Sequence, residues 1–190
     1  KIVYNANGGT GTMSDTTGVT DQTVQVATNS FTRAGYTFTG WNTKADGSGT
    51  DYSEGADYAL TATNLALYAQ WSANPSKIVY DANGGEGLVT DTEGVTDQTV
   101  KVATNTFTRD GYTFVGWNTK ADGTGTSFSE NSNYILTADN IVLYAQWKEI
   151  EEIPESPATP DNILEIVSIC ALSSAAVSAL LFALARRRRI

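Results

Sequence analysis

Few residue types in this 190-residue chain are capable of acid–base or nucleophilic chemistry. The sequence contains no histidine, and its single cysteine, Cys170, lies in a long apolar stretch. Without histidine there is no Ser–His or Cys–His pair to activate a nucleophile, and no imidazole to bind a metal ion. We therefore assign no catalytic, cofactor-binding or metal-binding residues, expect no cofactor, and do not expect an enzyme.

Two glycine-containing segments are similar in composition to known ligand-binding loops. Residues 42–47, Asn-Thr-Lys-Ala-Asp-Gly, resemble the start of a calcium loop. However, Lys44 stands where an EF-hand needs an oxygen ligand, and Ser53 where it needs a bidentate Glu. Residues 7–11, Asn-Gly-Gly-Thr-Gly, lack the Gly-Lys-Ser/Thr of a phosphate-binding loop. Since Gly and Asn adopt positive φ at little cost, both segments are predicted to form tight turns.

The segment of sequence that contains these turns occurs twice in the chain, at a constant offset of 76 residues and without a gap. Residues 1–4, 40–47 and 67–71 recur as residues 77–80, 116–123 and 143–147. Each copy is near the smallest size that folds without disulfides or metal, so its aromatic residues must supply the core. All nine aromatics of the first copy have an aromatic counterpart in the second. We expect most of them to be buried, and Trp41 and Trp117 to be core residues.

Hydrophobicity within a copy alternates with a period of two, which predicts β-strands. The pattern is clearest in residues 23–27, 36–39 and 65–71. No window of ten or more residues has a sustained helical stripe. We expect at most one short helix or helical turn per copy, within residues 53–63 or, as second choice, residues 15–22. The predicted fold class is α+β, mostly β, with two tandem modules and a C-terminal transmembrane helix.

Composition divides the chain into six predicted segments. The two modules are expected to be joined by a short proline-containing linker that makes a semi-rigid string. An acidic, proline-rich spacer follows, because three prolines and clustered glutamates prevent core formation. A transmembrane helix and a basic cytoplasmic tail complete the chain. In order, the segments are residues 1–71, 72–76, 77–147, 148–162, 163–185 and 186–190.

The predicted transmembrane segment contains twenty residues without a charge, 166–185. At a rise of about 1.5 Å per residue, a helix of this length spans the ~30 Å hydrocarbon core of a bilayer. Basic residues prefer the cytoplasmic side, so the repeats are expected outside the cell. The alternative, a buried core helix, fits poorly with the stop-transfer residues that follow, which are Arg186, Arg187, Arg188 and Arg189.

The chain is acidic outside these arginines. Its formal net charge is −9, and without the four arginines residues 1–185 carry −13. Such a surface repels phosphate groups, so nucleic acid is not an expected partner. The predicted modules contain no cysteine, which fits exported modules of a Gram-positive type of surface. Lys1 opens a strand-like segment without a signal peptide, and we expect the C-terminal part of a longer exported protein.

Both copies resemble the internalin-type B repeat, also called the Listeria–Bacteroides repeat, over their full length. The resemblance is carried by residues 4–9 (Tyr-Asn-Ala-Asn-Gly-Gly), by Phe-Thr-Arg-Ala-Gly-Tyr-Thr-Phe-Thr-Gly-Trp-Asn-Thr at 31–43 with residues 44–47, and by Leu-Tyr-Ala-Gln-Trp at 67–71. It implies a small β-grasp-like module, found in tandem on bacterial surface proteins between an N-terminal region and a wall anchor. It implies no catalytic residues.

The C-terminal part is similar to a Gram-positive cell-wall sorting signal, in which Leu-Pro-any-Thr-Gly precedes an apolar span and a basic end. The aligned residues are Ser156, Pro157, Ala158, Thr159 and Pro160. Pro160 replaces the glycine after the cleaved threonine, so a sortase would have to break a tertiary imide. The similarity implies sortase and peptidoglycan as partners, and simple membrane retention is the alternative.

These observations predict the C-terminal part of a bacterial cell-surface protein, with extracellular repeats and a membrane or cell-wall anchor. The repeats are expected to act as a stalk or spacer, with an adhesive role left open. One alternative is that the repeats themselves bind a host surface protein or glycan. Another is that they carry a surface enzyme whose catalytic domain lies N-terminal to Lys1. The near-identity of the copies favours spacing or avidity, because multivalent display gains from repetition.

Overall fold

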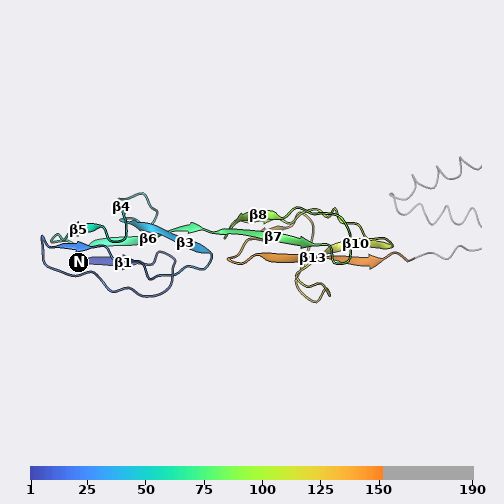
Figure 1. Cartoon of the computed structure of the whole chain (residues 1–190), viewed down its shortest axis with the longest axis horizontal. Coiled ribbons are helices and arrows are strands. Elements are labelled where there is room, and N and C mark those ends of the chain that lie inside the picture. The colour runs from blue at the N-terminus through green and yellow to red at the C-terminus, as the bar shows by residue number, and fades with distance from the viewer. Residues whose placement is uncertain (152–190) are drawn as a thin grey trace, which may run out of the picture. The chain divides into compact units, whose positions relative to one another are not determined.

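A computed structural model describes residues 1–151 of the protein (Figure 1). Within these residues the chain forms thirteen β-strands and no helix, arranged as two modules of closely similar structure. Both modules belong to one compact unit that ends at Ile150. The mostly-β, tandem-repeat part of the prediction is therefore confirmed.

The first module is built on a four-stranded sheet with the order β1-β6-β3-β4. Strand β1 pairs with β6 in parallel, and the other neighbours are antiparallel. A separate antiparallel pair, β2 and β5, is formed by residues of the long connections. The strands are β1 (Ile2–Asn5), β2 (Thr23–Gln25), β3 (Tyr36–Asn42), β4 (Asp51–Tyr52), β5 (Asp57–Ala59) and β6 (Leu65–Ala73).

The second module repeats this arrangement and adds one strand at an edge of the sheet. Its sheet has the order β11-β10-β13-β7-β8, and β9 pairs with β12. Figure 1 labels β7, β8, β10 and β13 of this sheet. The strands are β7 (Pro75–Asp81), β8 (Thr92–Val95), β9 (Thr99–Lys101), β10 (Tyr112–Asn118), β11 (Ser127–Phe128), β12 (Asn133–Ile135) and β13 (Ile141–Glu149).

A β-bulge in β3 brings two large rings to the same face of the sheet. The pairing of β3 with β6 shifts between Phe38 and Gly40, which places one extra residue in β3. Gly40 has φ of +147°, a value that favours glycine. Because of the extra residue, Phe38 and Trp41 both point to the core although they are three positions apart. Their ring centroids lie 5.0 Å apart with an edge-on orientation.

Each module encloses one fully buried tryptophan, as predicted for Trp41 and Trp117. The ring of Tyr4 lies 4.9 Å from Trp41 and that of Phe31 lies 6.1 Å away, centroid to centroid. Seven of the nine aromatics of the first module belong to this core or pack against it, which confirms the expected aromatic core. They are Tyr4, Phe31, Phe38, Trp41, Tyr52, Tyr58 and Trp71.

The polar atoms of two core rings hold the loop that follows β2. The indole N–H of Trp41 donates to the carbonyl of Ala27 at 3.2 Å, and the amide of Ala27 donates to the Tyr4 hydroxyl at 2.7 Å. Ala27 is therefore fixed through both of its backbone groups without belonging to a sheet. The second module has the same pair of bonds on Ala103.

The expected helical element within residues 53–63 is absent from the described part of the chain. Its place is taken by a turn, in which the amide of Ala56 donates to the carbonyl of Ser53, followed by β5. The reason is a period of two that the sequence prediction missed. Ala56, Tyr58 and Leu60 pack inward, while Asp57 and the residue after Tyr58 are exposed.

The second choice, residues 15–22, is also not helical. Thr16 forms an isolated bridge with Ile2, and Asp21 has φ of +67°, which a helix does not allow. The helical part of the α+β prediction for the modules is therefore wrong, because within residues 1–151 the long connections form turns, irregular segments and short strand pairs.

The central tryptophan predicts a large and specific loss of stability on truncation. Trp41→Ala removes the ring and also leaves the Ala27 carbonyl without its donor. We expect a loss of about 3–5 kcal/mol in the free energy of unfolding, measured by chemical denaturation. Thr39→Ala, on the exposed face of the same strand, is the control and should change stability by less than about 0.5 kcal/mol. An unchanged stability in Trp41→Ala would contradict the core assignment.

Candidate functional site

The loop formed by residues 42–50 is closed by a single buried side chain. Nδ2 of Asn42 donates to the carbonyl of Gly47 at 3.1 Å and to Asp51 at 2.6 Å. Its Oδ1 accepts the amides of Lys44 at 2.8 Å and Gly49 at 3.0 Å. All the polar atoms of this amide are thus used within the loop. The turn predicted here is confirmed.

The carboxylate of Asp46 also stabilises this turn by accepting hydrogen bonds. Oδ1 of Asp46 accepts the amide of Ser48 at 3.0 Å and its hydroxyl at 2.8 Å. The amide and then the hydroxyl of Ser48 lower the pKa of Asp46 below its ordinary value. Asp122 and Thr124 repeat the arrangement in the second module, with the same effect on the pKa of Asp122.

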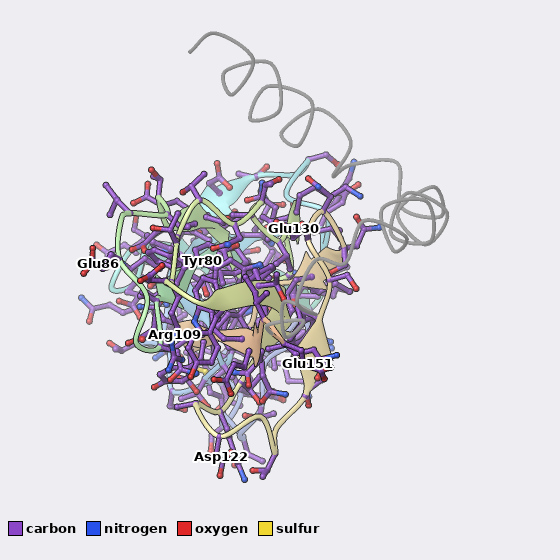
Figure 2. All side chains as sticks on the ribbon, turned by 90° about the vertical axis from the view of Figure 1, so that its right-hand side faces the viewer. Tyr80, Glu86, Arg109, Asp122, Glu130 and Glu151 are labelled. Carbon is purple, nitrogen blue, oxygen red and sulfur yellow. The ribbon has the colours of Figure 1, made fainter. Side chains whose placement is uncertain are left out.

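The acidic side chains of the second module do not converge on a metal site. In Figure 2, Asp122 lies at the tip of a projecting loop, while Glu86 and Glu130 lie well apart from it and from each other. Nowhere in residues 1–151 do three or more His, Cys, Asp or Glu side chains gather closely enough to hold a metal ion.

The segment of residues 7–11 also begins with a turn, as predicted. Asn7 and Gly8 have positive φ values of 47° and 88°. Nδ2 of Asn7 donates to the carbonyls of Ala45 and Ala69, both at 2.8 Å, which joins this turn to the 42–50 loop and to β6. At Gly9 a Cβ atom would lie 2.8 Å from the Trp71 ring, so the glycine is required by packing.

The predicted anchoring residues lie outside the described part of the chain. This applies to most of the spacer, to the sorting-like residues 156–160, to the transmembrane segment 163–185 and to Arg186–Arg189. Within residues 1–151 the structure has no helix long and apolar enough to cross a membrane.

The described residues that do form a distinctive site lie at the junction of the two modules. Strand β6 ends at Ala73 and β7 begins at Pro75, so a single residue, Asn74, separates them. The amide of Asn74 donates to the carbonyl of Gly35 at 2.8 Å, and its carbonyl accepts the amide of Thr96 at 2.9 Å. Asn74 is thus bonded through its backbone to both modules. Its side-chain oxygen also accepts the hydroxyl of Thr37 at 2.6 Å.

One side-chain hydrogen bond crosses the junction directly. The hydroxyl of Tyr36 in the first module donates to Asp97 of the second module at 2.6 Å. The guanidinium of Arg33 covers the Tyr36 ring, with 3.7 Å between its central carbon and the ring centroid. The hydrogen bond to Asp97 raises the pKa of Tyr36 above its ordinary value, helped by burial and by the negative charge of Asp97 and opposed by Arg33.

Close packing accompanies these bonds. Gly35 has φ of +76°, and a Cβ atom there would lie 2.5 Å from Cγ2 of Thr96 and 3.0 Å from Cα of Ala138. Thr96 is 6% exposed. We name the turn formed by residues 33–36 the tyrosine turn, and the surface of Thr96, Asp97 and Ala138 that receives it the receiving face.

Sequence reasoning did not identify these junction residues. Tyr36 and Asp97 are separated by 61 positions, and neither belongs to a recognisable motif. The available signals were the glycine before Tyr36 and the Asn-Pro pair within residues 72–76, which indicate a turn and an extended segment but no contact.

A second surface feature is a shallow hollow in the second module, lined among others by Gly84, Phe107, Arg109, Tyr112 and Trp147. The guanidinium of Arg109 lies over the Tyr112 ring, 4.0 Å from its centroid. Figure 2 shows Arg109 on the side of the module that faces the viewer.

Comparison with known proteins agrees with this architecture. The family model of the Listeria-Bacteroides repeat domain matches residues 1–70 and 77–146. A protein described as a Gly-rich membrane protein of Evansella cellulosilytica is 36% identical over 123 residues, which cover 61% of this chain and 14% of that protein. A second membrane protein of the same organism is 34% identical over 123 residues, or 60% of this chain and 17% of that protein.

Internalin H of Listeria monocytogenes is 37% identical over 130 residues, covering 67% of this chain and 22% of internalin H. The chain therefore spans less than a quarter of the length of these relatives. The family match covers both modules and includes the tyrosine turn and the receiving face on either side of Asn74. The chain belongs to the Listeria-Bacteroides repeat family and carries two copies of the repeat.

Proposed function

We propose that this chain is part of a bacterial cell-surface protein in which the two repeats form a stiff stalk. The observation that carries the proposal is the junction, where Asn74 is hydrogen-bonded to both modules. A spacer must resist bending between its units, and a flexible linker would not. Here the linker residues continue the strands, and Tyr36 and Asp97 add a second point of attachment beside them.

The chemistry of the modules supports a structural role over catalysis. In residues 1–151 every buried side-chain nitrogen or oxygen has a hydrogen-bond partner, so no buried polar group awaits a ligand. The sequence has no histidine to act as a general base at neutral pH. We infer that the repeats are not enzymatic and need no cofactor.

The anchor is proposed from the sequence of residues 156–190. The uncharged segment within residues 163–185 matches bilayer thickness, and Arg186–Arg189 would keep the end cytoplasmic. Relatives named as membrane proteins and as an internalin support a location at the cell surface. Attachment to peptidoglycan by a sortase is the further step, in which Pro160 stands at the position of the usual glycine.

Direct binding of a host surface protein or glycan is the second candidate function. The hollow beside Arg109 favours it, because a cation and aromatic rings line one open surface. Such a combination is common where proteins contact carboxylates or ring faces. The acidic charge of residues 1–185 excludes nucleic acid from this proposal.

A stiff junction predicts different effects for two equivalent glycines. Gly35 and Gly111 have φ of +76° and +75°, so alanine costs about 1–2 kcal/mol of backbone strain at either position. Only at Gly35 does the new methyl group collide with the other module; at Gly111 nothing in residues 1–151 lies within 4 Å. We expect Gly35→Ala, but not Gly111→Ala, to broaden the distance distribution between spin labels at Thr39→Cys and Val115→Cys.

These labels are introduced with Cys170→Ser, and both labelled positions are exposed. The unaltered junction should give one narrow distance peak. A broad distribution without any glycine change, or equal broadening by both alanines, would contradict the stalk.

The anchor is tested by fractionating cells after digestion of the wall. Retention of an intact chain in the membrane fraction is expected if Pro160 prevents cleavage, and peptidoglycan fragments on Thr159 are expected if a sortase acts. Pro160→Gly restores the usual glycine and should raise the wall-linked fraction severalfold. Thr159→Ala is the control that abolishes wall linkage and leaves membrane retention. Recovery of the protein in the cytosol would overturn the surface location.

One surface substitution distinguishes direct binding by the repeats from a role as a stalk. Arg109→Gln removes the cation of the hollow and keeps a polar side chain of similar reach. If the repeats are a stalk, adhesion of cells or beads that display the protein stays unchanged. A loss of adhesion with an unchanged melting temperature would favour direct binding. Lys148→Gln, an exposed cation outside the lining of the hollow, serves as the matched control.

A further inference from the structure

We propose that the first module carries a second receiving face, which docks the tyrosine turn of a further repeat of this kind placed ahead of Lys1. The face is formed by Thr20, Asp21 and Ala62. The 76-residue offset makes these three residues the counterparts of Thr96, Asp97 and Ala138. The inference rests on the geometry of the observed junction and is independent of how the protein is anchored.

The second face already has the conformation of the occupied one. Asp21 and Asp97 have nearly equal φ values, 67° and 66°. The amide of Asp21 donates to Leu60 at 2.7 Å, and that of Asp97 donates to Leu136 at 2.8 Å.

The neighbouring glutamines hold both faces in the same way. Oε1 of Gln22 accepts the amide of Val19 at 3.1 Å, and Oε1 of Gln98 accepts that of Val95 at 3.0 Å. The turn is therefore ordered without a partner, so docking would require little rearrangement.

The two faces differ in how far their residues are exposed to solvent. Thr96 is buried in the junction, whereas Thr20 is exposed. Val95 is 39% exposed and Val19 is 73% exposed. Thr96 is thus the one residue of the receiving face that the junction buries, because Asp97 and Ala138 stay exposed, and the corresponding change on docking at the second face would be the burial of Thr20.

The edge of the sheet is also incomplete in the first module. In the second module, β8 pairs with β7 from Pro75 to Ile78. In the first module only the counterpart of the last of these pairs is present, as the isolated bridge between Ile2 and Thr16. Of the other three partners in β7, the linker residues Pro75 and Ser76 supply two and Lys77, the counterpart of Lys1, supplies the third. A repeat joined through the same linker would therefore extend the edge over residues 16–19.

A second copy of this chain fits the face less well than a repeat joined in sequence. The tyrosine turn of its second module has Asp110 where the first has Ala34, which adds a carboxylate beside the glycine that packs on the face. Ile150 stands at the position of Asn74 and offers no side-chain oxygen to Thr113, the counterpart of Thr37. Opposing carboxylates and a lost acceptor both disfavour this pairing.

The test uses the full chain with residues 1–76 repeated once ahead of Lys1, so that the native linker joins the copies. Thr96 donates its amide to Asn74, and docking would give the Thr20 amide the same partner. We expect hydrogen exchange at Thr20 to slow by about tenfold or more, toward the rate at Thr96. Without the added repeat, Thr20 should exchange fast.

Two variants test whether the tyrosine turn causes the protection. Gly35→Ala in the added repeat should return Thr20 to fast exchange, since its methyl group would meet Thr20 as it would meet Thr96. Gly111→Ala introduces the same backbone change at a site that does not contact the face, and should leave Thr20 protected. Protection that survives Gly35→Ala in the added repeat, or fast exchange at Thr20 despite the added repeat, overturns the proposal.

The other molecule that could bind the second receiving face is a second copy of this chain. Light scattering tests this alternative, because it detects a dimer. If the chain without the added repeat dimerises and its Thr20 amide becomes protected with rising concentration, the face binds another copy and the proposal is wrong. A monomer with an exposed Thr20 agrees with it. Failure of any of these tests leaves the membrane and wall fractionation results unaffected, so the two proposals can fail separately.

Discussion

The indole at the centre of each repeat must be surrounded by apolar groups and must also find an acceptor for its N–H. Trp41 meets the first condition through the β3 bulge, which turns Phe38 to the same face, and the second through the carbonyl of Ala27. Because Ala27 also donates to the Tyr4 hydroxyl, the loop after β2 is fixed by side chains of the sheet that it covers. This arrangement explains how a module of this size folds without a helix, disulfide or metal in its described residues. The second module repeats each contact, so the solution is a property of the repeat and not of one copy.

Asparagine side chains fix the turns of the module, and of the two described here Asn42 is buried and Asn7 is half-buried. Asn42 closes the 42–50 loop with all its amide atoms, and Asn7 fastens the neighbouring turn to that loop and to β6. A loop whose polar atoms are satisfied internally is ordered without a ligand and has little to offer one. The segment that is similar in composition to a calcium loop is therefore a structural turn.

The alternation in residues 23–27, 36–39 and 65–71 predicts strands where β2, β3 and β6 lie, and the 76-residue offset predicts the tandem modules. The burial of Trp41 and Trp117 is also predicted correctly. The prediction is wrong at residues 53–63, where the alternation of Ala56, Tyr58 and Leu60 has a period of two and the segment contains the strand β5 instead of the expected helical element. It also did not reach the junction, because a contact over 61 positions such as that of Tyr36 with Asp97 depends on how the sheets are joined and not on any local pattern. Local periodicity specifies elements, whereas contacts between modules follow only from the three-dimensional arrangement.

Few contacts join the two modules at the junction, and their number indicates how the junction is stabilised. It is held by a few hydrogen bonds and one packed glycine, whereas a typical interface between separate proteins carries about ten hydrogen bonds. In this chain Asn74 connects the two surfaces covalently, so docking is an intramolecular step with a high effective concentration, and weak contacts suffice to fix the angle between repeats. The turn that docks at the junction has Ala34, whereas the corresponding turn of the second module, residues 109–112, has Asp110, so the two turns are not interchangeable as docking elements.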